Sequence, residues 1–375
     1  MQKKYQHLGS YSDIVAEAQR QDPVFPLAHP GRETQEKVRQ VLGWNRLPDS
    51  PPEVQVEKRW ERDGLDCEQI SWSVGYGPRT QAWVFKPEGI RKPLPAVLAL
   101  HDHGGFKYTT KEKIANGPES IPQFLLNKRA ELYGGRAWVN ALAKEGFVVL
   151  VHDAFLWGSR RFDIETMRAA LRYWIETPEE ELRIERENFG TPAEVADYNY
   201  LARHFEHVVA KYLTVLGTNL AGVINYEDRL ALNYLYSRPD VQRENVACMG
   251  LSGGGARAGL LRATADELKA AVIVGMMSSY PGLLDHNIEC HTWMFFPPGW
   301  ARYGDWPDLV ACQAPAPLLV QYDRDDDLFT PNGMQAAHDR LKLHYSNAGV
   351  PEAYSGQFFP GPHKFDLEMQ AAAFE

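Results

Sequence analysis

A serine flanked by glycines stands between an apolar run and a segment of small residues. The apolar run covers residues 246–249, the motif Gly-Leu-Ser-Gly-Gly covers 250–254, and small residues that suit a helix continue to 261. This pattern predicts a strand, a sharp turn and a helix with Ser252 at the apex, because a Cβ on either neighbouring glycine would collide with the strand or the helix. Free N–H groups at such a helix start stabilise a developing oxyanion. We expect acyl transfer with Ser252 as nucleophile; a turn whose serine only caps the helix is the alternative.

The acid and the histidine of such a hydrolase follow the serine in the chain, each after a later strand. Residues 317–322 predict a buried parallel strand, and an aspartate-rich turn follows it. The candidate acids are Asp323, Asp325, Asp326 and Asp327. A solvated acidic turn or a loose cation site is the alternative, although the run lacks the glycine and the distal glutamate of a calcium loop.

His363 is the candidate base, because it follows a segment that suits the last strand and lies among glycine and proline residues that indicate a loop. From such a loop one ring nitrogen reaches Ser252 while the other donates to an aspartate, which fixes the tautomer. An exposed loop histidine is the alternative. The chain order of serine, aspartate and histidine favours the catalytic role.

A histidine-rich and glycine-rich loop follows the strand expected at 95–100. Its sequence, His-Asp-His-Gly-Gly at 101–105, resembles the oxyanion loop of lipases and esterases, in which a loop N–H joins the N–H of the residue after the nucleophile. The candidate oxyanion donors are Gly253 and one of His103, Gly104 and Gly105. A metal site at His101, Asp102 and His103 is the weaker alternative, since no third cluster of ligands stands nearby in the sequence. We expect no metal.

From about residue 75 onward the sequence resembles the α/β-hydrolase superfamily, and within it the dienelactone hydrolase and acetyl xylan esterase-like group. The segments that carry the resemblance are 101–105, 133–136, 151–160, 237–240 and the elbow at 250–254, with 296–299 and 304–308 less specific. The resemblance implies a mostly parallel central sheet flanked by helices and a serine esterase that needs no cofactor.

The resemblance also selects one aspartate. The corresponding strand of the superfamily often ends in a glycine, two variable residues, the acid and an apolar pair, which places Asp326 as the acid and Asp323 in the place of the glycine. The nucleophile is serine where dienelactone hydrolases have cysteine, which favours ordinary ester hydrolysis. The sugar acetyl, uronate and aromatic esters are the substrate classes that we consider.

Composition and hydropathy limit the function classes. The chain has 375 residues, is 44% hydrophobic and 24% charged, and carries a net charge of −9, which argues against nucleic-acid binding. No apolar run indicates a signal peptide or a membrane span, so we expect a cytoplasmic protein. The expected partner is a small-molecule ester substrate, and assembly into a homo-oligomer is left open. Four cysteines without Cys-x-x-Cys spacing predict buried free thiols.

The order of elements predicts an N-terminal helical extension at 1–52 and an α/β-hydrolase domain at 53–375. The expected helices of the extension are 13–20 and 33–42, the expected antiparallel strands are 54–60, 68–74 and 81–85, and the expected parallel strands are 95–100, 147–152, 245–250, 270–275, 317–322 and 355–359. A helical insertion at about 159–218 precedes the nucleophile strand, with helices at 164–174, 178–187 and 193–216. A lid over the serine and a peripheral decoration are equal alternatives for it.

Residues that could contact a substrate are less specific. Trp157, Trp293 and Trp300 fall in loops after core strands, where open parallel sheets bind ligands, although they suit a core equally well. Arg257 could pair with a substrate carboxylate, although a structural salt bridge is the favoured alternative. His204 and His207 share a helix face and could bind a metal, but a solvated helix is favoured.

A serine carboxylic-ester hydrolase is therefore the function that the sequence predicts. A serine aminopeptidase or oligopeptidase on the same scaffold is the first alternative. A non-catalytic binding protein on a hydrolase fold is the alternative of another class.

Overall fold

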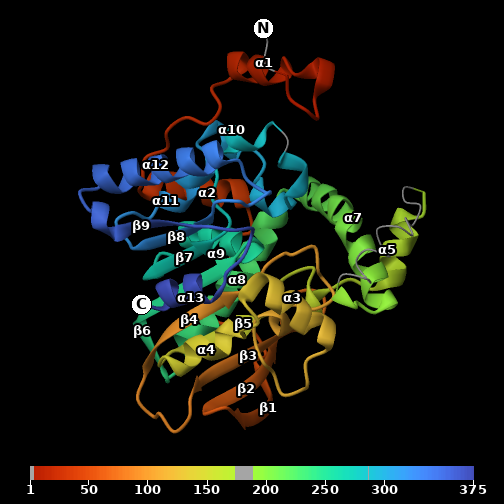
Figure 1. Cartoon of the computed structure of the whole chain (residues 1–375), viewed down its shortest axis with the longest axis vertical. Coiled ribbons are helices and arrows are strands. Elements are labelled where there is room, and N and C mark those ends of the chain that lie inside the picture. The colour runs from red at the N-terminus through yellow and green to blue at the C-terminus, as the bar shows by residue number, and fades with distance from the viewer. Residues whose placement is uncertain (1–3, 174–188, 286) are drawn as a thin grey trace.

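The computed structural model describes residues 4–173, 189–285 and 287–375. Within these residues nine strands form one sheet in the order β1-β2-β3-β5-β4-β6-β7-β8-β9 (Figure 1). The strands are β1 Gln55–Arg62, β2 Leu65–Trp72, β3 Thr80–Pro87, β4 Leu94–Leu100, β5 Val148–His152, β6 Val241–Leu251, β7 Ala270–Val274, β8 Leu318–Asp323 and β9 Tyr354–Phe359. The β1–β2, β2–β3 and β3–β5 pairs are antiparallel, and every later pair is parallel. The predicted mostly parallel sheet with an antiparallel beginning is confirmed.

Helices cover both faces of this sheet. The helices are α1 Ile14–Gln21, α2 Arg32–Leu42, α3 Gln123–Tyr133, α4 Trp138–Lys144, α5 Ile164–Leu171, α7 Ala193–Val215, α8 Leu220–Ser237, α9 Gly253–Thr264, α10 Tyr280–Leu283, α11 Trp306–Ala311, α12 Pro331–Asn347 and α13 Leu367–Phe374. Single 3₁₀ turns are η1 Gly9–Tyr11, η2 Lys111–Lys113, η3 Gly158–Arg160, η4 Ile288–Cys290, η5 Trp293–Phe295, η6 Trp300–Arg302 and η7 Pro351–Ala353. The expected helix at 178–187 lies outside the described residues.

Alternate side chains of a central strand enter two separate cores. On β4, Leu98 and Leu100 belong to the core that α2, α8, α9, α11 and α12 share, whereas Val97 and Ala99 belong to the core of α3, α4 and α13. This alternation follows from the two-residue period of a strand that is buried on both faces. Loops at the carboxyl ends of the parallel strands are therefore held between two packed layers.

The described helices between β5 and α8 form an arm beside this body (Figure 1). Its described helices are α5 and α7, and α7 buries one face that repeats with helical period from Val195 to Leu213. Glu206 is the charged residue of that buried face and is 5% exposed. No single described helix is long and apolar enough to cross a membrane; α7 and α8 pass that test only as a pair bent by 86°.

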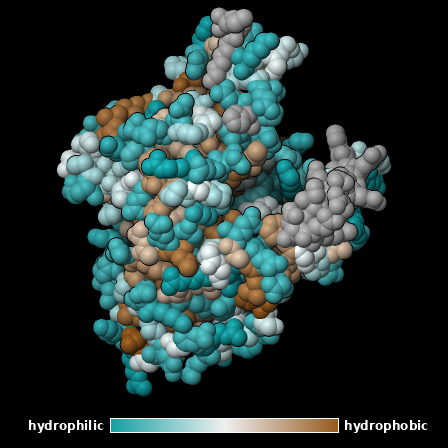
Figure 2. All heavy atoms as spheres, in the orientation of Figure 1, coloured by the Kyte–Doolittle hydropathy of each residue, from teal (hydrophilic) through white to brown (hydrophobic). Residues whose placement is uncertain are grey.

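The surface in Figure 2 is hydrophilic over most of the visible face, with hydrophobic residues in small separate patches. Before the sheet, α2 contributes Val38 and Leu42 to the larger core, whereas α1 buries no residue. The division at residue 52 stays a prediction. The expectation of four buried thiols is wrong for Cys290, which is exposed in the loop that follows α10, while the other three cysteines are free and buried.

Candidate active site

Ser252 occupies a sharp turn between β6 and α9. Its φ is 56° and its ψ is −124°, a region that residues other than glycine rarely adopt. The Ser252 N–H donates to the Val274 carbonyl at 2.8 Å, which ties the turn to the next strand. A Cβ on Gly250 would lie 2.6 Å from the Leu100 carbonyl oxygen, so the chain passes through this turn only with glycine there. The strained serine is thus fixed at the N-terminus of a buried helix.

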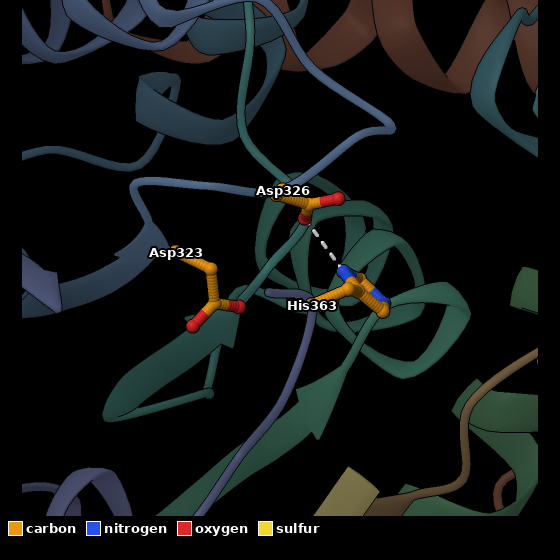
Figure 3. A group of neighbouring side chains, drawn as sticks. All are labelled: Asp323, Asp326 and His363. Carbon is orange, nitrogen blue, oxygen red and sulfur yellow. Dashed lines mark hydrogen bonds and ion pairs between the residues drawn. The ribbon is translucent and has the colours of Figure 1, made fainter. Parts of the chain in front are cut away.

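His363 and Asp326 form a hydrogen-bonded pair beyond the ends of β8 and β9. His363 Nδ1 donates to Asp326 Oδ2 at 2.6 Å (Figure 3). The other oxygen of Asp326 accepts the Leu328 N–H at 2.9 Å. Burial lowers the pKa of His363, but the hydrogen bond and the negative charge of Asp326 outweigh it and raise the pKa above its usual value. The pair is therefore built to stabilise an imidazolium.

The second nitrogen of this histidine is available. Among the described residues, His363 Nε2 is buried and has no hydrogen-bond partner. His363 and Ser252 line the same cavity of about 390 Å³, together with Gly253 and the loop at 103–106. We call it the serine cavity. Hydrogen bonds between a base and its nucleophile often form only in the substrate complex, so the arrangement suits a base that acts on Ser252.

The competing aspartates have other contacts. Asp325 is exposed and accepts the Gly361 N–H at 2.8 Å, and Asp327 is exposed too. Asp323, at the end of β8, is 1% exposed and accepts the Lys364 N–H at 3.1 Å. Burial raises the pKa of Asp323 to about 7. The structure therefore brings Asp326 to the histidine ring and places Asp323 as a second, buried carboxyl beside the pair (Figure 3).

One group of possible metal ligands occurs in the described part of the chain. Ligand atoms of Asp323, Asp326 and His363 lie within 4.8 Å of one another. A cation there would compete for the Nδ1 of the histidine that already binds Asp326. The two histidine pairs considered from the sequence, at 101 and 103 and at 204 and 207, belong to no such group among the described residues.

The loop after β4 packs directly on the serine turn. A Cβ on Gly253 would lie 2.7 Å from the backbone nitrogen of His103. Gly104 adopts a φ of 55° beside the buried Asp102 carboxylate, which leaves no room for a side chain. The Gly105 N–H is already donated to His103 Nδ1 at 3.0 Å. Of the candidate oxyanion donors, the N–H groups of Gly253, His103 and Gly104 are therefore the ones left for a ligand.

Glu206, which the sequence did not single out, holds this loop in place from α7. Its carboxylate accepts from His103 Nε2 at 3.0 Å, from Thr292 Oγ1 at 2.6 Å, from the Trp293 N–H at 3.1 Å, and from the buried Lys107 ammonium. Burial raises the pKa of Glu206, but the Lys107 charge and the His103 bond outweigh it and hold the pKa well below its usual value. In the sequence, Glu206 could have been identified as a glutamate that occupies an apolar position of an amphipathic helix.

Three of the residues expected near a substrate are instead internal. Arg257 is 1% exposed and its guanidinium donates to Asp228 at 2.6 Å, so the favoured alternative, a structural salt bridge, is confirmed, and the candidate role in binding a substrate carboxylate is corrected. Trp157 is 1% exposed and packs edge-on against His103. Trp300 is fully buried and donates from Nε1 to the Asp305 carbonyl at 2.9 Å. Trp293 alone of the three tryptophans is exposed, at 44%.

Comparisons with known proteins agree with this architecture. No family model matches the chain. A Bacillus subtilis (strain 168) protein, YtaP, provisionally named a hydrolase, is 22% identical over 312 residues, which cover 82% of this chain and 86% of YtaP. A Bacteroides fragilis NCTC 9343 structure provisionally described as an acetyl xylan esterase superposes with a TM-score of 0.68 at 18% identity, covering 94% of this chain and 82% of that one. This chain has the α/β-hydrolase fold.

Two further structures, both described as esterases, superpose over nearly the whole chain. The glucuronoyl esterase from Solibacter usitatus gives a TM-score of 0.59 at 13% identity, covering 91% of this chain and 90% of that one. Acetyl xylan esterase 1 from Thermoanaerobacterium sp. JW/SL YS485 gives 0.52 at 13% identity, covering 95% and 96%. On this fold, a strained serine at a helix start, a histidine bonded to a buried aspartate and free backbone donors share one cavity. That arrangement can carry out nucleophilic acyl transfer.

Proposed function

We propose that this protein is a serine hydrolase that cleaves carboxylic esters of small molecules. Ser252 is the nucleophile, His363 the general acid–base and Asp326 the residue that orients it. The observation that carries the proposal is the shared cavity, which is lined both by a serine at φ 56° and by a histidine whose Nδ1 is bonded to a buried aspartate. The fold shared with esterase structures supports it.

The reaction follows from these contacts. Ser252 Oγ attacks the ester carbonyl carbon while its proton passes to His363 Nε2, and the carbonyl oxygen becomes an oxyanion held by the N–H of Gly253 and a loop N–H from His103 or Gly104. The C–O bond to the alcohol then breaks, and the alcohol leaves with the proton from Nε2. Water attacks the acyl-enzyme, gives a proton to Nε2, and releases the acid and a free serine.

The Asp326 bond matters at each proton transfer. It keeps the imidazole in the tautomer with a free Nε2, and its charge stabilises the imidazolium that forms twice in a turnover. The raised pKa of His363 means that the ring is a stronger base than a free histidine, and that activity falls as the pH drops through this raised pKa.

Sugar acetyl, uronate and aromatic esters are the substrates that we propose to test first, because the proteins of similar fold include acetyl xylan and glucuronoyl esterases by name. Fluorophosphonate labelling of wild type and Ser252→Ala, measured by intact mass, tests the nucleophile. We expect one adduct on the wild type and none on the variant, with turnover of p-nitrophenyl acetate by the wild type only. Peptide amides in the same assay separate esterase from peptidase. A wild type without adduct or turnover would overturn the proposal.

A further inference from the structure

A second cavity adjoins the serine cavity along the loop that follows β4. It has a volume of about 440 Å³ and shares with the serine cavity the segment 103–106 and the residues His291 and Thr292. Its remaining wall comes from α7, from Arg203 to His207 among others, and from Trp293. We call it the α7 cavity. The shared lining makes this space adjacent to the one in which a carbonyl at Ser252 would lie.

Trp293 gives the α7 cavity a fixed aromatic surface. The side chain is 44% exposed, yet its Nε1 donates to His207 Nδ1 at 2.8 Å and its backbone N–H donates to Glu206. Because these two hydrogen bonds already fix the indole, it loses little conformational entropy when a ring stacks on it. Less of the favourable contact energy is then offset on binding. The exposed indole thus suits a flat or pyranose ring.

Arg203 gives the same cavity a free cation. It is exposed on α7, one turn before His207 and hence on the same face of the helix. Among the described residues it makes no ion pair or hydrogen bond. Arg257, in contrast, forms a buried ion pair with Asp228. The guanidinium presents several donors in one plane, which matches a carboxylate.

The other charges of the cavity do not cancel this cation. Arg203 and Lys128 are the cationic residues of the cavity lining, and Glu206 and Glu289 are its acidic residues. Glu206 is paired with the ammonium of Lys107, which is buried and does not line the cavity. With the buried Lys107 counted, the charged groups at the cavity carry a net charge of +1, on a chain whose net charge is −9. Electrostatics and shape together favour a ring with a negative group.

We propose that the α7 cavity binds a ring that carries a carboxylate and belongs to the ester substrate, with the ring on Trp293 and the carboxylate on Arg203. This inference rests on the proposed function. The ring with the carboxylate can belong to the alcohol part or to the acyl part of the ester. Matched substrates distinguish these two cases.

Selectivity between acid and amide substrates tests the proposal. On the alcohol side, 4-acetoxybenzoate is compared with 4-acetoxybenzamide; on the acyl side, the mono-4-nitrophenyl ester of terephthalic acid is compared with its carboxamide analogue. We expect wild-type kcat/KM to favour the carboxylate by about tenfold in one arm, as a charge-assisted bond to a partly buried group allows. Equal kcat/KM in both arms overturns the proposal.

Two variants assign the selectivity to residues. Arg203→Gln is expected to bring the acid-to-amide ratio to about 1, mainly through KM, because the cation is lost and the reacting groups stay in place. Lys211→Gln removes a charge from an exposed position two turns further along α7 and is expected to keep the wild-type ratio. A similar loss in both variants would indicate long-range attraction in place of a binding site, and would contradict the assignment.

A binding measurement keeps the test independent of turnover. Calorimetric titration of Ser252→Ala with benzoate and with benzamide is expected to show binding of benzoate that Arg203→Gln, made in the same background, weakens about tenfold. If wild type fails to react with fluorophosphonate but this binding is seen, the proposed function fails and the carboxylate site stands. Equal binding of benzoate and benzamide refutes the site whatever the enzyme does.

Discussion

Replacing Asp326 by asparagine is expected to lower kcat about 10³-fold while the protein stays folded. The Asp326 carboxylate is 4% exposed and accepts from His363 Nδ1 at 2.6 Å, so the imidazolium of the transition state has a buried counter-charge at hydrogen-bond distance. Breaking a buried charged pair costs about 4 kcal/mol, and each 1.36 kcal/mol of barrier is a factor of ten in rate. An asparagine amide would also donate to Nδ1, which places the ring proton on Nε2, where it blocks proton uptake from Ser252.

The assay compares Asp326→Asn with Asp325→Asn and Asp323→Asn for p-nitrophenyl acetate, with thermal unfolding of each variant as the folding control. Asp325 is exposed and bonded to a backbone N–H, so its replacement is expected to cost less than about threefold. A variant at Asp325 or Asp323 that is more damaging than Asp326→Asn would refute the assignment of the acid. Equal activity of Asp326→Asn and wild type would refute the role of the pair altogether.

Three further predictions follow from buried groups around the site. The carboxylate form of Asp323 raises the pKa of His363, but burial raises the pKa of Asp323 itself to about 7, so much of this charge is lost on the acid limb of kcat/KM. Asp323→Asn is therefore expected to move that limb lower by less than about one pH unit; a profile from pH 5 to 9 checks this, and a shift upward would contradict it. Glu206→Gln leaves the buried Lys107 ammonium without its counter-charge, and is expected to lower the free energy of unfolding by about 3 kcal/mol, measured in urea, and to reduce kcat through a looser oxyanion loop. Gly254→Ala sets a methyl group against the carbonyl oxygen of the adjacent strand and is expected to cost about 2 kcal/mol of stability, measured by thermal unfolding, together with ester turnover; wild-type stability and activity would show that the turn tolerates a side chain.

The elements that position the site could be predicted from local patterns. Apolar runs such as 317–322 gave strand positions within a few residues of β8 and its neighbours, because strands buried on both faces are continuously apolar. The serine turn was recognisable because glycine is required on both sides of it. The strand order, in which β3 pairs with β5 and not with β4, depends on contacts between distant segments and has no local signal.

Side-chain roles that depend on distant partners could not be predicted. Whether an arginine is free or paired is decided by residues far away in the sequence, as Asp228 is for Arg257. The tryptophans show the same limit, since Trp300 lies in the core and Trp293 at the surface although both follow core strands. Arg203 had no distinguishing neighbours in the sequence, and only the fold shows that it faces a cavity.

Helix α7 both supports the loop at 101–105 and lines a cavity, which has a consequence for engineering this protein. One turn of the helix carries Glu206, which holds the loop at 101–105 through His103, and Arg203 and His207 on either side of it line the α7 cavity. Replacing α5 and α7 by the corresponding helices of another protein, in order to alter substrate preference, would therefore remove the Glu206–His103 contact together with the cavity wall. A chimera is better joined so that Glu206 and its contacts to His103 and Thr292 are retained, with diversity introduced at positions such as Arg203 and His207 around that fixed point.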